Sequence, residues 1–200
     1  MNHPYLPSGI VKLIAIDPGS FKCGFCVYDI DFKERKIVRI SAETIKVESL
    51  KNDTGIPEEL ITASSLRYYK LRSELVKRFD ELTPHYVAYE GPFMNRLQPS
   101  AFGPLVAMMT LVRDAVIHYN VGVPFTIFQP QVVKKSVDIA GKKGKEVVIE
   151  ALRKVSEIMD ALVTDLDTLD DNAIDAIAVG YAFFKDQIQK SNDQPSKKKG

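Results

Sequence analysis

The stretch VKLIAIDPGS, residues 11–20, decides the fold that the sequence predicts. Residues 11–16 form a short, mainly apolar run, which indicates a buried strand. The next four residues, DPGS at 17–20, place a Pro-Gly pair between polar residues, which is typical of a tight turn. The stretch therefore predicts a central strand that ends on an acidic side chain.

The rest of the hydrophobic pattern predicts four more strands and four helices. We expect the strands at residues 23–30, 36–47, 86–89 and 123–128. We expect the helices at residues 57–82, 99–119, 145–162 and 171–184. Three antiparallel strands followed by alternating helices and strands predict an α/β fold, in which a five-stranded mixed sheet is flanked by helices.

The composition is that of one compact protein. The chain has 200 residues, of which 45% are hydrophobic, and this suits a single domain with its own core. We expect that domain at residues 1–186 and a basic, disordered tail at 187–200. No apolar run approaches ~20 residues, the N-terminus has no apolar signal core, and two cysteines make no disulfide framework. These features predict a cytoplasmic protein with no membrane partner.

Four acidic residues are candidates for a catalytic metal site. Asp17 and Glu90 each end a predicted central strand, where the active sites of open α/β sheets cluster. Asp171 and Asp175 lie four residues apart, on one face of a last helix that is apolar nearly all round. Buried carboxylates are costly unless they are paired or bound to metal, and no Lys or Arg precedes Lys185 in that helix. An all-oxygen site predicts Mg²⁺, with Mn²⁺ as a substitute and two ions ~4 Å apart.

Several of these residues also have a purely structural explanation. Asp17 can form a turn with the Pro-Gly pair that follows it, and Asp170 or Asp171 can cap the last helix. The sequence leaves both alternatives open. Cys23 and Cys26 have C-x-x-C spacing, but odd spacing along a strand points them to opposite faces, which argues against a zinc or redox site.

Four stretches together resemble the RuvC family of Holliday-junction resolvases. IAIDPGS at 14–20, followed by Gly24, resembles the family's opening motif, and YEGPFM at 89–94 resembles the segment with the second acid. The stretch from 129 to 148, which reads QPQVVKKSVDIAGKKGKEVV, is similar to the family's basic stretch, and DAIA at 175–178 resembles the closing motif. The four occur in family order and span residues 14 to about 182.

The resemblance implies an RNase H-like fold and a metal-dependent, structure-selective DNA endonuclease of the crossover-junction type. Its substrate would be branched DNA, with the four-way junction the leading candidate, and it would use no nucleotide cofactor. It would act as a homodimer, because a junction needs two symmetric cuts, and we expect the interface at helix 99–119.

The sequence departs from the family at two places. The family usually has an acid or a histidine three residues before the last Asp, and Asn172 stands there. We expect Asp171 to take that role, with the amide oxygen of Asn172 as the alternative. The segment at residues 31–60 is also longer than the corresponding segment is usually found to be in the family. These departures indicate a diverged member, from a phage or an organelle.

Basic and aromatic residues near these motifs are the candidate DNA contacts. They are Phe93, Arg96, Lys134, Lys135, Lys142, Lys143 and Lys145. Five lysines within a dozen residues form a local positive patch in a chain whose net charge is only +1, and phosphate contacts supply most non-specific DNA affinity. Phe93, three residues after Glu90, could stack on an unpaired base. The alternatives are a solvated loop for the lysines and a core position for Phe93.

Two other functions remain as rivals at this point. An actin-like ATPase or phosphotransferase shares the strand, turn and strand with an early Asp and Gly, but it needs two such domains, for which 200 residues leave no room. A catalytically idle junction-binding module is the second rival. The presence of all four acids argues for the enzyme.

Overall fold

The computed structural model describes residues 9–52, 55–92, 102–139 and 145–192. Its five strands form one mixed sheet in the order β3-β2-β1-β4-β5. The strands are β1 (Ile10–Asp17), β2 (Lys22–Asp31), β3 (Lys36–Lys46), β4 (Tyr86–Glu90) and β5 (Phe125–Phe128). β1, β2 and β3 pair antiparallel, whereas β4 runs parallel to β1 and to β5. The expected α/β class and mixed five-stranded sheet are confirmed.

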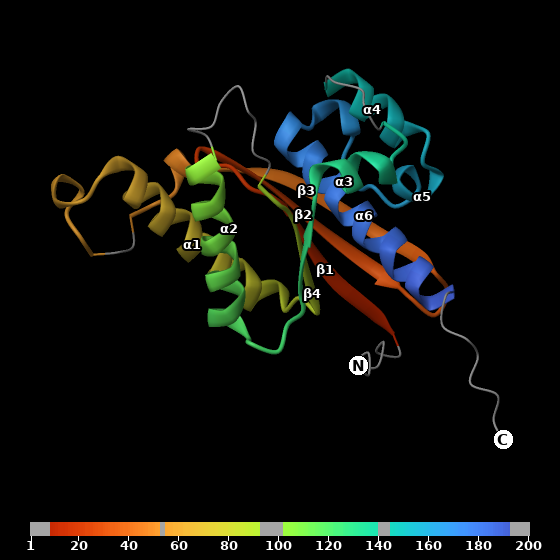
Figure 1. Ribbon diagram of the computed structural model, residues 1–200, viewed down its shortest axis with the longest axis horizontal. Coiled ribbons are helices and arrows are strands. Elements are labelled where there is room, and N and C mark those ends of the chain that lie inside the picture. The colour runs from red at the N-terminus through yellow and green to blue at the C-terminus, as the bar shows by residue number, and fades with distance from the viewer. Residues whose placement is uncertain (1–8, 53–54, 93–101, 140–144, 193–200) are drawn as a thin grey trace.

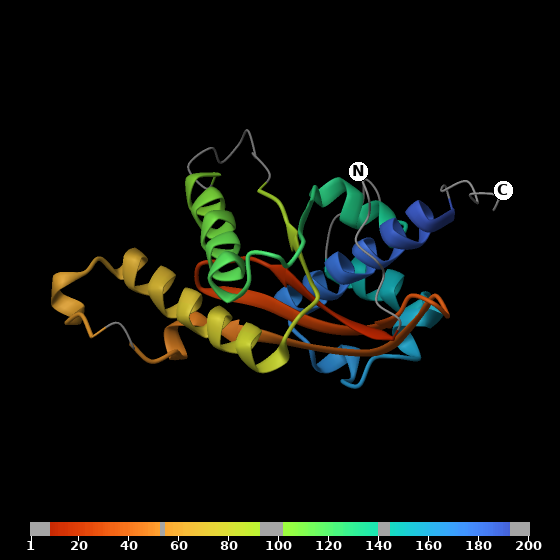
Figure 2. The ribbon, with the colours of Figure 1, turned by 90° about the horizontal axis from the view of Figure 1, so that it is seen from below.

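Helices cover both faces of the sheet. The sheet therefore lies between two helical layers, as Figure 1 and Figure 2 show. One layer holds α1 (Ala63–Leu82) and α2 (Phe102–Tyr119). The other holds α3 (Pro130–Ser136), α4 (Lys145–Arg153), α5 (Ser156–Met159) and α6 (Asp171–Asn192). Alternate strand residues supply two cores: Ile14 and Ile16 pack under α1 and α2, and Leu13 and Ala15 pack under α6.

The two cysteines follow the same alternation. Cys23 belongs to the core under α1 and α2, and Cys26 to the core under α6. Both are buried and free. The expectation that their side chains point to opposite faces is confirmed.

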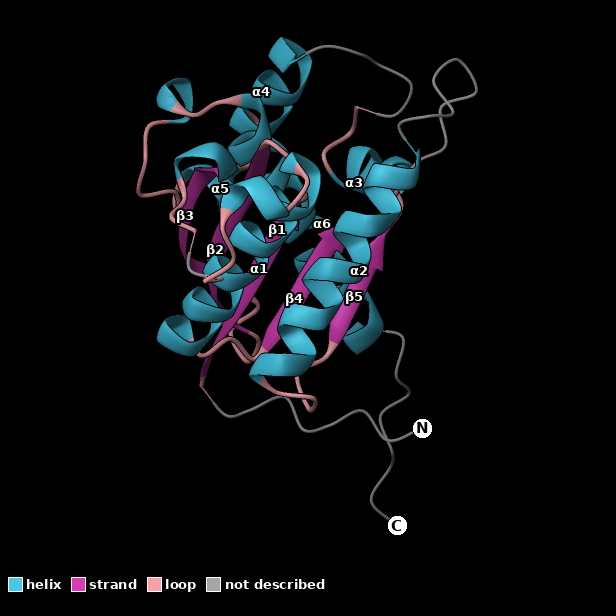
Figure 3. Ribbon diagram, turned by 90° about the vertical axis from the view of Figure 1, so that its left-hand side faces the viewer, coloured by secondary structure: helices cyan, strands magenta, loops and turns pink. Residues whose placement is uncertain are grey.

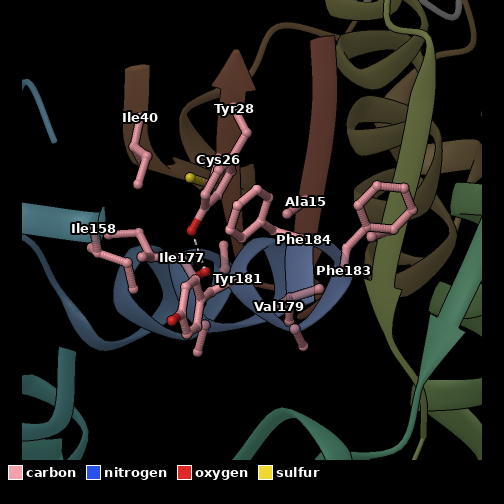
Figure 4. Packing of buried hydrophobic residues seen from close by; sticks show 14 of the residues in the cluster. Ala15, Cys26, Tyr28, Ile40, Ile158, Ile177, Val179, Tyr181, Phe183 and Phe184 are labelled. Carbon is pink, nitrogen blue, oxygen red and sulfur yellow. Dashed lines mark hydrogen bonds between the residues drawn. The ribbon is translucent and has the colours of Figure 1, made fainter. Parts of the chain in front are cut away.

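A close contact fixes the middle of α6 against β2. The hydroxyl of Tyr28 donates a hydrogen bond of 2.6 Å to the carbonyl oxygen of Ile177, as drawn in Figure 4. A Cβ at Gly180 would lie 2.1 Å from the Tyr28 ring. Only a residue without a side chain lets the helix approach this ring, and the approach sets the position of α6 on the sheet.

The helices expected at 57–82 and 145–162 differ from their predicted bounds. α1 begins at Ala63 rather than at 57, because Thr62 caps it by accepting a hydrogen bond from the Ser65 amide, and residues 58–60 form the 3-10 helix η2. The helix expected at 145–162 is divided into α4 and α5, because Val155 adopts an extended conformation between them. Short 3-10 turns also stand at η1 (Val47–Ser49) and η4 (Leu166–Thr168).

α3 was not predicted, although its sequence carries two signals for a helix. Pro130 stands in the first turn, where its fixed φ suits a helix. Val133 and Val137, four residues apart, are both buried in the core under α6. The run was too short for hydrophobic periodicity to stand out.

α6 continues to Asn192, eight residues past the predicted end at 184. Residues 187–192, which we expected in the tail, are therefore helical. Residues 193–200 lie outside the described residues, and the division of the chain into one domain and a tail stays a prediction. Within the described part of the chain, no helix combines the length and apolarity needed to cross a membrane.

Candidate active site

Asp17 and Glu90 end neighbouring parallel strands at the same edge of the sheet. In the β1–β4 pair, Ile16 lies opposite Tyr89, so the two acids are the next residues in register. Because successive side chains alternate between faces and Ala15 packs under α6, Asp17 returns to the α6 side. Both acidic side chains are half-buried. The parallel pairing explains why acids 73 positions apart meet, as the sequence predicted for strand ends.

α6 brings Asp175 to this edge. A Cβ at Gly24 of β2 would lie 1.9 Å from the carbonyl oxygen of Asn172 and 3.2 Å from the Cβ of Ala176. The first turns of α6 therefore lie directly on the β2 backbone, and Asp175 is half-buried beside the strand ends. The charges of Glu90 and Asp175 both act on Asp17, so the three acids form one electrostatic group.

Burial and mutual repulsion favour the protonated forms of these acids. Burial raises the pKa of Asp17 well above its ordinary value, and the charges of Glu90 and Asp175 raise it further. Burial and then Asp175 raise the pKa of Glu90 to about 7, although a hydrogen bond from Asp17 and the charge of Lys134 oppose this. Burial and then Asp171 raise the pKa of Asp175 to about 6. The hydrogen bond between the two raises the pKa of Asp17 and lowers that of Glu90, which makes Asp17 the favoured donor of the pair.

Asp170 and Asp171 have different environments. Asp170 accepts hydrogen bonds from the hydroxyl of Thr44 and, at 3.3 Å, from the amide of Ala173, and its carboxylate lies 3.7 Å from the Nζ of Lys22. Burial opposes its ionisation, but these contacts hold the pKa of Asp170 below its ordinary value. Asp170 therefore caps α6.

Asp171 is exposed, and its charge raises the pKa of Asp175. Asn172, the alternative fourth ligand, donates a side-chain hydrogen bond to Asp170 and so is tied to the cap. Asp170 and Asn172 thus both take part in the cap, and Asp171 is the fourth ligand that we expected from helical spacing. The assignment of a fourth ligand remains a prediction.

The donor set fits a divalent cation in its chemistry. Asp17, Glu90 and Asp175 offer only carboxylate oxygens, which Mg²⁺ and Mn²⁺ prefer. Among the described residues, no three Asp, Glu, His or Cys side chains are arranged as a formed metal site. A cation would offset the repulsion that, together with burial, raises the three pKa values.

The candidate DNA contacts are only partly described. Lys134 and Lys135 lie exposed on α3, and Lys145 is the first residue of α4. Phe93, Arg96, Lys142 and Lys143 lie outside the described residues, and their roles remain predictions.

Lys134 lies beside the acids, and not only in a basic patch at a distance from them. It lines a cavity of about 250 Å³ together with Glu90 and Asp175. Its charge opposes the rise in the pKa of both acids. α3 follows β5 directly, beyond the edge at which β4 ends, as Figure 3 shows. From the sequence we expected this lysine only in a basic run, because its position beside the acids depends on α3, which was not predicted.

The raised pKa values predict how Glu90 affects stability. A carboxyl whose pKa is higher in the folded state than in the unfolded state stabilises the fold below its unfolded pKa, and this contribution is lost as pH rises through the folded pKa. For Glu90 the loss falls between about pH 4.5 and pH 7. Without divalent cations, the change in unfolding free energy caused by Glu90→Gln should therefore be more stabilising at pH 8 than at pH 5, by on the order of 2 kcal/mol. Urea unfolding in EDTA at both pH values measures this difference, and a difference of zero or of opposite sign contradicts the assigned electrostatics.

The sequence matches no protein-family model and no curated protein, but the fold matches solved structures. Thermus thermophilus RuvC in complex with a Holliday junction substrate has 20% identity and a TM-score of 0.66, over 90% of this chain and 96% of that one. The yeast mitochondrial Holliday junction resolvase Ydc2 has 14% identity and a TM-score of 0.64, over 95% and 83%. The fowlpox virus resolvase with its junction DNA has 13% identity and a TM-score of 0.54, over 88% and 99%. The chain therefore has the RNase H-like fold of the RuvC-type resolvases.

Proposed function

We propose that the protein is a metal-dependent endonuclease that hydrolyses phosphodiester bonds in branched DNA, with the four-way junction as its leading substrate. The observation that carries the proposal is the convergence of Asp17, Glu90 and Asp175, from β1, β4 and α6, at one edge of the sheet with raised pKa values. Solved structures with this fold include resolvases bound to junction DNA. The cytoplasm is its proposed location, where the free thiols of Cys23 and Cys26 stay reduced.

Each acid has a part in the proposed chemistry. Asp17, Glu90 and Asp175 would lose their protons and hold Mg²⁺ or Mn²⁺, with Asp171 as the expected fourth ligand. The bound ions would activate water and stabilise the leaving oxygen of the phosphodiester. Lys134 would hold a phosphate beside Glu90 and Asp175 and offset the negative charge that gathers there.

A panel of synthetic DNAs of equal sequence tests the substrate class. It should contain a four-way junction, a three-way junction, a flap and a linear duplex, each with Mg²⁺ and with EDTA. We expect cleavage of the branched DNAs in Mg²⁺, fastest for the four-way junction, and none in EDTA. Tight junction binding without cleavage in any metal would instead support a catalytically idle binding module. Equal cleavage of duplex and branched DNA would overturn the structure selectivity.

Asp171→Asn and Asp170→Asn separate the metal ligand from the helix cap. Asp171→Asn should lower the cleavage rate at least about tenfold, because it removes a charge beside Asp175. Asp170→Asn should leave the rate nearly unchanged, since asparagine also caps helices well. Single-turnover rates on the four-way junction measure both. Equal rates for the two variants would show that the wrong acid was chosen, and a more severe loss in Asn172→Ala would identify Asn172 as the ligand.

The proposal includes a homodimer, because two symmetric cuts need two sites. α2, the expected interface, exposes Ile117 to 50%, and Ile127 on the edge strand β5 is 43% exposed on the same side of the sheet. Apolar side chains of this size on neighbouring elements suit a protein interface. The mass of the protein in solution, measured by light scattering, distinguishes a dimer from the 22.4 kDa monomer.

A further inference from the structure

A half-exposed phenylalanine stands on the turn that follows Asp17. Phe21 is 51% exposed, and its carbonyl oxygen accepts a hydrogen bond of 2.9 Å from the amide of Val47. The bond ties the turn between β1 and β2 to η1, at the start of the connection to α1. Because Phe21 is four residues from Asp17, their Cα atoms lie no more than about 14 Å apart.

The exposed ring is covered by the guanidinium of Arg67 on α1. The guanidinium carbon lies 4.1 Å from the centroid of the Phe21 ring, a stacked cation–π arrangement. This contact holds the guanidinium over the ring.

Arg67 differs from the other arginines of α1 in having no counter-ion. Arg72 is paired with Asp114 at 2.5 Å, and Arg78 is paired with Glu43 and Glu74. Arg67 has no ion pair within the part of the chain that the structure describes, and its Nε is buried without a hydrogen-bond partner. Among the described residues no acceptor offsets the charge of this guanidinium, so its terminal nitrogens are available to a further anion.

We propose that Arg67, stacked on Phe21, binds a backbone phosphate of the DNA strand that is cut. This inference rests on the proposed nuclease function. A planar guanidinium with a fixed orientation matches the oxygens of a phosphate and binds them by two parallel hydrogen bonds. Because Phe21 stands on the turn that follows Asp17, this phosphate would lie a few nucleotides from the scissile bond.

The position of the Phe21–Arg67 pair gives it a role that the lysines cannot fill. Arg67 belongs to the helical layer of α1 and α2, whereas Lys134 on α3 belongs to the opposite layer, and the strand ends with the acids lie between them (Figure 1). A DNA strand crossing the acids would therefore meet a cation on each side. Two such contacts hold the scissile phosphate in register over the acids, which one basic patch could not do.

Arg67→Gln tests this contact through the salt dependence of DNA binding. Binding of the four-way junction in EDTA, measured by fluorescence anisotropy at several salt concentrations, needs no cleavage. We expect the Kd to rise about three- to tenfold, and the slope of log Kd against log salt to fall by about 0.9, as for one lost phosphate contact. Arg67→Lys keeps the charge and loses the fixed plane, so it should keep the slope while its Kd rises.

Arg72→Gln is the matched control, because it removes a charge from the same helix where that charge is already paired with Asp114. Its slope should equal that of the wild type. An unchanged slope in Arg67→Gln, with normal cleavage by the wild type, overturns the contact and leaves the nuclease function standing. A wild type that binds junctions but cuts no DNA overturns the nuclease function, and the slopes then still decide whether Arg67 touches phosphate.

Discussion

Asp17→Asn is expected to lower the rate of junction cleavage by at least about 1000-fold while junction affinity stays within about threefold. The substitution keeps the size of the side chain and removes its charge. It takes one carboxylate from the centre of the group formed with Glu90 and Asp175, so the ions would lose a ligand that neutralises them. The proposed phosphate contacts at Lys134 and Arg67 remain, which is why binding should survive. Single-turnover cleavage and binding in Ca²⁺ or EDTA measure the two effects separately.

The control for this prediction is Asp29→Asn. Asp29 lies opposite Lys12 in the β1–β2 pair, far along β1 from Asp17, and its carboxylate is 3.1 Å from the Nζ of Lys12. Its loss should leave cleavage unchanged. Full activity in Asp17→Asn, or an equal loss in Asp29→Asn, would show that Asp17 serves the turn and not the reaction.

Gly24→Ala should reduce both stability and cleavage, although Gly24 has no side chain that could take part in the reaction. The Cβ of alanine would lie 1.9 Å from a backbone oxygen of α6. A side chain could relieve such a contact by changing its rotamer, but a backbone oxygen cannot. The first turn of α6 must move, which we expect to cost about 1–3 kcal/mol of unfolding free energy. The same movement carries Asp171 and Asp175 away from Asp17, so cleavage should fall at least about 100-fold at a temperature where the variant is folded.

Gly103→Ala is the matched control, since its Cβ would meet none of the described residues within 4 Å at the start of α2. It should keep a melting temperature close to that of the wild type, because Pro104 disfavours a helical conformation in the residue before it and so offsets the helix preference of alanine over glycine. Normal cleavage in folded Gly24→Ala would mean that the position of α6 does not control the acids.

The parts of the fold with long hydrophobic patterns were predictable from the sequence. The apolar run before Asp17 and the alternation in residues 23–47 identified the meander, and the even spacing of Leu71, Leu75 and Phe79 identified α1. The acids were predictable because each stands where a strand ends or a helix begins. Their positions could be inferred from element order alone, since parallel strands end at a common edge.

The parts that depend on tertiary contacts were not predictable. The end of α5 at Met159, where the sequence predicted a helix to 162, follows from pairing across the chain, because Ile40 of β3 donates to the carbonyl of Ala161 and accepts from the amide of Val163. The contact between Arg67 and Phe21 joins residues 46 positions apart, and no sequence pattern within either segment predicts it. The same holds for Asp170, whose partners Lys22 and Thr44 come from two other strands.

The central claim is that the three converging acids form a metal-dependent catalytic centre. The most direct measurement is single-turnover cleavage of a labelled four-way junction by the wild type and by Asp175→Asn, with Mg²⁺, with Mn²⁺ and with EDTA. We predict cleavage by the wild type in either metal, none in EDTA, and a loss of at least about 1000-fold in the variant with either metal. Cleavage that persists in EDTA, or that survives the loss of Asp175, would contradict the account.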